Sequence, residues 1–206
     1  MGTTTTTYGL GQLVARFPGA RPVATAAVVA YIHVTLDDQA KQWQGFFGDD
    51  VAKPTVLPEP LAGDVIDLEG QELRLIEVGQ GDIAPSTVIH IPSIDTVIAS
   101  DVAYNRIHLM LALSGPDQWQ AWINSVDQVA GLAAKTIVAG HKRPGASDDD
   151  VATILDGTRA YIRDFRDAVA ASSTAGEVVQ IMKTKYQDYG NSTTLRFSAR
   201  AAFPAA

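Results

Sequence analysis

The chain has 206 residues, a hydrophobic fraction of 46% and a net charge of −7, which predicts one globular domain with a substantial core. The acidic charge argues against nucleic acid as a partner, and the absence of cysteine excludes disulfides, cysteine-ligated zinc and thiol nucleophiles. No apolar run reaches the roughly 18 residues of a membrane span and no signal peptide is evident, so we expect a cytoplasmic protein without a membrane partner.

The first quarter of the chain is expected to be mostly helical. Residues 1–7 are a polar, threonine-rich start, which we interpret as a frayed end or an engineered scar. Residues 8–17 carry apolar side chains at helical spacing, and residues 21–24 are a short strand candidate. Thr25 can then cap a second helix, which we expect to continue through residues 37–50.

Four short segments are predicted to form β-strands in the middle of the chain. Residues 65–68 and 72–78 flank a Glu-Gly-Gln turn, and the second of them alternates apolar and polar side chains as in a half-buried strand. Residues 87–91 and 96–99 are β-branched runs separated by a Pro-Ser-Ile-Asp turn. These two runs therefore predict a buried hairpin.

Two predicted strands lead into residues that carry chemistry. Residues 96–99 lead into Asp101, and a later strand at residues 136–139 leads into Gly140 and His141. The junction of a buried strand with a loop is a usual position for a metal ligand or a catalytic acid. We expect Asp101 and His141 to converge at one edge of the sheet, with carboxylate and imidazole within about 6 Å, the range in which opposite charges shift each other's pKa.

Further polar residues follow the same strands. Asn105 and His108 lie four and seven residues after Asp101, the spacing of one helical face, so they could reach the same pocket. There His108 could act as a catalytic group that polarises a carbonyl or orients water; the alternative is one polar face of a capped helix. Gln80 and Asp82, in the glycine-containing loop after residues 72–78, are candidate substrate-binding residues, with an ordinary turn as the alternative.

The order of these pieces carries a resemblance to a known family. A strand, the run Asp-Val-Ala-Tyr-Asn-Arg-Ile-His, an amphipathic helix and a strand ending on Gly-His resemble the C-terminal half of a metallo-β-lactamase-fold hydrolase, over residues 8–165. The resemblance implies an α/β fold, a metallo-β-lactamase-like αββα sandwich. It also implies that Asp101 bridges two metal ions and that His141 completes the second metal site.

The chain departs from the family pattern in two places. The signature His-x-His-x-Asp-His should lie just before Tyr8, where this chain has methionine, glycine and five threonines, and Gln80 stands where the family usually has histidine. These departures imply a single domain over residues 1–206, truncated at its N-terminus, with the N-terminal sheet missing and residues 174–206 as a C-terminal helical extension. With two strong ligands, zinc or another divalent metal is expected to bind weakly or not at all.

Two functions therefore stay open from the sequence. The resemblance implies a metal-dependent hydrolase of a lactone, thioester or β-lactam carbonyl, acting on a small molecule through metal-bound water and inactive or impaired as this chain. The alternative is a non-catalytic binding or oligomerisation module. A generic α/β enzyme is disfavoured because neither a Gly-x-Ser-x-Gly elbow nor a phosphate loop occurs. An uncovered apolar sheet would require a second copy or the missing N-terminal segment as partner.

Overall fold

The computed structural model describes residues 7–48 and 56–203. Its centre is a five-stranded sheet with the strand order β3-β4-β5-β6-β7. The strands from β3 to β6 pair antiparallel with their neighbours, whereas β6 and β7 pair in parallel. The strand bounds are β3 Val65–Leu68, β4 Gln71–Gly79, β5 Ser86–Ile91, β6 Thr96–Asn105 and β7 Thr136–Lys142.

The five strands predicted from residue 65 onward are all present and form this sheet. A turn of 3-10 helix, η2 (Pro92–Ile94), joins β5 to β6, as the predicted hairpin requires. The prediction that a helix follows Asp101 is wrong, because β6 continues to Asn105. Ser100 adopts a positive φ of 50°, and the β6–β7 register shifts on both sides of it. This bulge lets the strand bend and continue, so Asp101 and Asn105 belong to a strand and not to one helical face.

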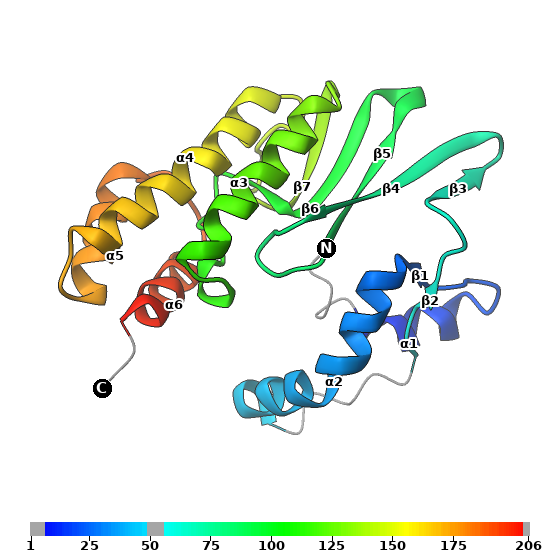
Figure 1. Ribbon diagram of the computed structural model, residues 1–206, viewed down its shortest axis with the longest axis horizontal. Helices are drawn as coiled ribbons and strands as arrows, with labels where there is room; N and C mark the ends of the chain where they lie inside the picture. The colour runs from blue at the N-terminus through cyan, green and yellow to red at the C-terminus, as the bar shows by residue number, and fades with distance from the viewer. Residues whose placement is uncertain (1–6, 49–55, 204–206) are drawn as a thin grey trace.

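Helices α3 (Pro116–Gly131) and α4 (Val151–Ala170) cover one face of the sheet (Figure 1). Trp122 shows how the layers join, since it is fully buried and its indole N–H donates to the carbonyl of Val102 in β6 at 2.9 Å. Helices α5 (Ala175–Lys185) and α6 (Ser192–Ala202) continue this layer. Both contribute to the same core, through Val178 and Met182 of α5 and Leu195 and Ala199 of α6.

The N-terminal part lies on the other side of the sheet (Figure 1). It consists of α1 (Thr7–Arg16), β1 (Val23–Ala24), α2 (Ala26–Phe47) and β2 (Glu59–Pro60), with β1 and β2 paired in parallel. The helices and the short strand expected here are confirmed, and Thr25 caps α2 as predicted, accepting a hydrogen bond from the N–H of Val28. Residues 1–6 of the polar start and residues 49–50 of the expected second helix lie outside the described residues.

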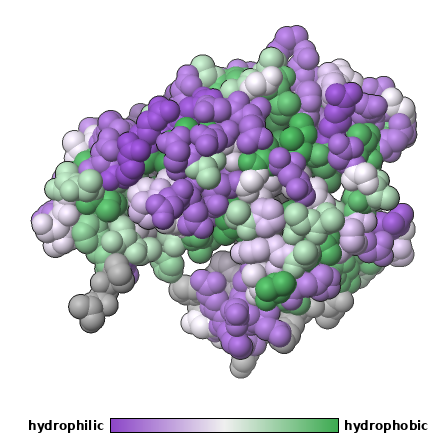
Figure 2. All heavy atoms as spheres, in the orientation of Figure 1, coloured by the Kyte–Doolittle hydropathy of each residue, from purple (hydrophilic) through white to green (hydrophobic). Residues whose placement is uncertain are grey.

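The sheet face opposite α3 and α4 keeps exposed hydrophobic residues. The strand register places Leu68, Leu75, Ile89 and Ile98 on this face, where Leu68 is 58% and Ile98 is 36% exposed. Figure 2, in the orientation of Figure 1, shows polar residues over α3 and α4. Hydrophobic residues reach the surface where the sheet lies. Among the described helices, none has the length and apolar character needed to cross a membrane.

Candidate functional site

The site is built where β6 and β7 run side by side. Asp101 follows the bulge in β6, and His141 lies near the end of β7, paired in register with Tyr104. The Tyr104 ring packs against the His141 ring, with 5.1 Å between their centroids. Gly140 permits this approach, because a Cβ there would lie 2.5 Å from Asp101 Oδ1 and 2.6 Å from the carbonyl of Ser100.

Asp101 and His141 form a direct pair. The distance from His141 Nε2 to Asp101 Oδ1 is 3.3 Å, so the predicted convergence within about 6 Å is confirmed. Asp101 is buried, whereas the His141 side chain is 52% exposed. The hydrogen bond that His141 donates to the Asp101 carboxylate raises the pKa of His141, because it favours the protonated imidazole. The pair therefore presents a partly exposed proton donor held by a buried carboxylate.

Asp82 adds a third titratable group to this pair. Burial raises the pKa of Asp82 to about 7, and the charge of Asp101 acts in the same direction. The N–H of Ile83 donates to Asp82 Oδ1 at 2.9 Å and opposes the shift. Burial also raises the pKa of Tyr31 in α2, with a further contribution from the charge of Asp82, so α2 approaches the site. Neutral and ionised forms of Asp82 therefore coexist near neutral pH.

The two amide side chains predicted to bind substrate are engaged by their own chain. Gln80 is buried, its Nε2 donates to the carbonyl of Gly81 at 3.1 Å, and its backbone N–H donates to Ser125 Oγ at 3.1 Å. Asn105 is also buried, and its Nδ2 donates to the carbonyl of Ser147 at 2.8 Å. These bonds hold the loops that flank the pair, and substrate binding by either amide stays a prediction.

The structure places His108 in a different environment from Asp101 and His141. Its Nδ1 lies 2.8 Å from the hydroxyl of Tyr161 in α4, and its ring packs against Tyr161 and Tyr189. Burial lowers the pKa of His108 to about 4, and the charge of Lys183 acts in the same direction. A neutral imidazole in an aromatic core favours a structural role, and the catalytic role stays a prediction that this placement does not favour.

The donor set does not fit a resident catalytic zinc ion. Two ligands on one tetrahedral zinc, each about 2.0–2.1 Å from the metal, lie about 3.3 Å apart, so the Asp101–His141 spacing would suit joint ligation. A catalytic zinc, however, takes about three protein ligands. Across residues 7–48 and 56–203, no group of three or more His, Cys, Asp or Glu side chains could hold a metal ion. The other histidines lie on α2 (His33), in β5 (His90) and in the aromatic core (His108).

Tyr104 and Tyr31 were missed by the sequence reasoning. Tyr104 reaches His141 only because β6 continues past the bulge, and Tyr31 reaches the vicinity of Asp82 only through the placement of α2. Tyr104 belongs to the run Asp-Val-Ala-Tyr-Asn-Arg-Ile-His, but the run by itself does not indicate a contact with His141, and Tyr31 belongs to no recognisable motif. The only sequence feature that pointed to the surroundings of Asp82 was the glycine-containing loop that carries Gln80 and Asp82.

Comparison with known proteins shows which proteins this chain resembles. The sequence model of the Metallo-beta-lactamase superfamily matches residues 13–141. A metallo-beta-lactamase family protein from Thermus thermophilus is similar in structure, with a TM-score of 0.61, 17% identity, and coverage of 95% of this chain and 68% of that one. A Beta-lactamase domain protein from Burkholderia ambifaria follows, with a TM-score of 0.56, 16% identity, and coverage of 88% and 58%. At these identities the likeness shows the fold alone. No curated protein sequence matches.

Proposed function

This chain belongs to the metallo-beta-lactamase superfamily, and we propose on that basis that it is a hydrolase-type domain whose carbonyl chemistry is impaired as the chain stands. Superfamily membership supports a metal-dependent, hydrolase-like function in general. The chain spans 68% and 58% of the two structures described above, so its substrates and activity are proposals. The candidate substrate class is a small molecule with a lactone, thioester or β-lactam carbonyl.

The observation that carries this proposal is the Asp101–His141 pair, 3.3 Å apart and joined electrostatically to Asp82. His141 can hold a proton and give it up, while Asp101 fixes the orientation of its ring. Asp82 can exchange a proton near neutral pH, since its pKa is about 7. General acid–base groups of this kind contribute about 10²–10⁴-fold, whereas enzymes reach at least about 10⁶-fold. A bound metal ion would supply part of the remainder by polarising the carbonyl, but the ligand set among the described residues is too small to hold one.

Metal analysis combined with a hydrolysis panel tests the proposal. We expect zinc to be lost on exhaustive dialysis against a mild chelator, and slow hydrolysis of a lactone, thioester and β-lactam with or without added zinc. Any residual activity should disappear in Asp101→Asn and His141→Gln, and it should persist in His33→Gln, a substitution on the exposed side of α2. Stoichiometric zinc that survives dialysis, with rapid hydrolysis, would contradict the impaired state.

The second candidate function is a non-catalytic binding or oligomerisation module. The exposed hydrophobic side chains of Leu68 and Ile98, on the sheet face opposite α3 and α4, favour it. For either function we propose that the chain forms a single domain, because side chains of α5 and α6 pack into the same hydrophobic core as those of α3 and α4. A net charge of −7 disfavours nucleic acid as the partner, and the absence of cysteine in the sequence suits the cytoplasm, which we propose as the compartment.

A further inference from the structure

A cavity of about 400 Å³ lies between the end of β6, the start of α4 and the segment that follows α5. Arg106 directly follows β6, Thr153 lies in the first turn of α4, and residues 185–189 are the last residue of α5 and the segment after it. None of Asp82, Asp101 and His141 lines it. The cavity is within the size range of small-molecule binding sites, and its ligand is independent of the proposed hydrolase function.

Hydrogen bonds accepted by backbone carbonyls hold the walls of this cavity in place. The N–H of Gly190 donates to the carbonyl of Arg106 at 3.1 Å, and the N–H of His108 donates to the carbonyl of Gly190 at 3.0 Å. The Arg143 guanidinium donates to the carbonyl of Asp188 at 3.1 Å. Arg106 itself has a φ of 53°, a left-handed conformation that suits glycine or asparagine better than a long side chain. The backbone therefore does not explain why an arginine stands at this position.

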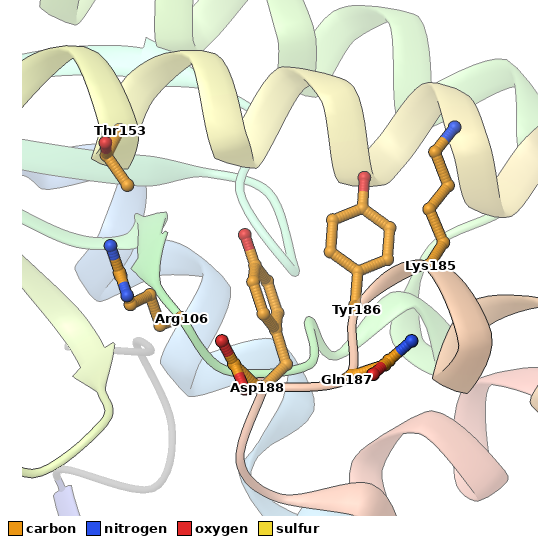
Figure 3. Close-up of a pocket in the computed structure, with 7 residues that line it drawn as sticks. Arg106, Thr153, Lys185, Tyr186, Gln187 and Asp188 are labelled. Carbon is orange, nitrogen blue, oxygen red and sulfur yellow. The ribbon is translucent and has the colours of Figure 1, made fainter.

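Three polar groups on the cavity wall lack a hydrogen-bond partner within the described part of the chain. They are the Arg106 guanidinium, the Thr153 hydroxyl and the Tyr189 hydroxyl. Burial raises the pKa of Tyr189 and the charge of Arg106 acts in the opposite direction, so guanidinium and hydroxyl lie within electrostatic range. In Figure 3, Arg106 and Thr153 lie on the same side of the cavity. All three groups can donate hydrogen bonds, which suits an oxyanion.

The opposite wall is already paired and presents an aromatic surface. The Tyr186 hydroxyl and the Lys185 ammonium group both bind the Asp164 carboxylate of α4, and Figure 3 shows both side chains pointing toward that helix. The rings of Tyr186 and Tyr189 pack with centroids 4.7 Å apart. This wall therefore offers ring surface rather than free charge. Asp188 also lines the cavity and lies near Arg106 in Figure 3, so its negative charge weakens the attraction of an anion to that side.

We propose that this cavity binds a small molecule whose oxyanion, a carboxylate or a phosphate, is held by Arg106 with Thr153 and Tyr189, and whose flat apolar part packs on Tyr186. An arginine fork matches the oxygen geometry of both anions. Cationic ligands are disfavoured, because the groups available to bind a ligand are the Arg106 cation and the hydroxyls of Thr153 and Tyr189. The site lies outside the group of Asp82, Asp101 and His141.

Titration of the isotope-labelled chain by NMR, with benzoate, phenyl phosphate, inorganic phosphate and the neutral benzyl alcohol, tests this site. We expect saturable shifts at Arg106, Thr153 and residues 186–189 with benzoate or phenyl phosphate at up to about 10 mM, and none with benzyl alcohol. Binding of benzoate alone assigns a carboxylate ligand, and binding of phenyl phosphate or inorganic phosphate alone assigns a phosphate. No saturable shift with any anion, or shifts confined to the surroundings of His141, would overturn the proposal.

Variants then assign the binding to the named groups. Arg106→Gln should weaken binding about tenfold or more, because one charge-assisted contact is lost, and Tyr189→Phe and Thr153→Val should each weaken it a few-fold. Arg163→Gln, the same charge change at an exposed position of α4 that does not line the cavity, should bind as the parent does. Unchanged affinity in a folded Arg106→Gln refutes the site. Should that variant fail to fold, unchanged affinity in Tyr189→Phe together with Thr153→Val refutes it.

Discussion

The carboxyl group of Asp82 lies where its neutral form is favoured. It is 8% exposed and faces the charge of Asp101, and its pKa rises from 3.8 to about 7. A group with a higher pKa in the folded state holds more protons when folded, so its contribution to stability is complete below about pH 4 and is lost as the pH rises through 7. The positive charge of His141 lowers the pKa of Asp82 and so reduces this loss of stability. Asp82 therefore couples folding to pH.

Replacing Asp82 with asparagine should remove this pH dependence. Between pH 5 and pH 8, in chelator-treated buffer, the free energy of unfolding of Asp82→Asn should fall about 2–3 kcal/mol less than that of the parent. Urea denaturation at several pH values measures it. Asp64→Asn, at an exposed position just before β3, is the matched control and should follow the parent profile. An equal loss of stability in Asp82→Asn would show that Asp82 is ionised in the folded state.

The β6–β7 pair is the element on which the site depends. Parallel pairing brings the later part of both strands to one edge, and the bulge at Ser100 turns Asp101 toward β7. A glycine at 140 lets the two strands approach where Asp101 and His141 meet. The register of these two strands, rather than the spacing of residues along either one, sets the 3.3 Å contact.

A methyl group at position 140 should disturb this register. In Gly140→Ala the added Cβ would lie 2.6 Å from the carbonyl of Ser100, a backbone group that cannot rotate away. We expect a loss of about 1–3 kcal/mol of stability, the usual cost of overpacking, and loss of the raised pKa of His141 in an NMR titration. Gly131→Ala, at the end of α3 where open space surrounds the added methyl, should leave the His141 titration unchanged and should not lower the stability. A parent-like titration of His141 in Gly140→Ala would contradict this account of the contact.

The molecule as a whole leaves one face of its sheet without a layer of helices comparable to α3 and α4. The strand register aligns Leu68, Leu75, Ile89 and Ile98 on that face, two of them substantially exposed. At about 25 cal/mol per Å², covering about 500 Å² of such surface would be worth on the order of 12 kcal/mol, comparable to the net stability of a domain. Association would cost part of this gain, and we expect the rest to drive burial of this face against a second copy.

Sedimentation velocity at micromolar concentration should show self-association of the chain through this face. The double variant Leu68→Thr with Ile98→Thr places β-branched residues, which favour strands, at both positions. It removes hydrophobic surface and should shift the protein to monomer. Val34→Thr, at an 82% exposed position of α2, should not. A cooperative monomer of the parent chain that binds no hydrophobic dye would mean that the face is covered by its own chain.

The sequence was enough to predict the elements and one contact of the site. Period-2 and period-3.6 patterns identified the five strands of the central sheet and most helices, since those patterns record local burial, but they did not identify β2. The meeting of Asp101 and His141 was predicted because two strands lead into these chemically active residues, although both strands continue past them. Superfamily membership, expected from the order of the pieces, is confirmed by the match over residues 13–141.

The rest depended on contacts between residues far apart in the chain. The run after Asp101 is too short for its period to distinguish strand from helix, and pairing with β7 made it a strand. Packing against Tyr161, 53 residues away, placed His108 in the aromatic core. Burial beside Asp101 raised the pKa of Asp82, and the segment after α5 closed the cavity around Arg106. Burial and proximity are properties of the folded chain, and local sequence patterns do not contain them.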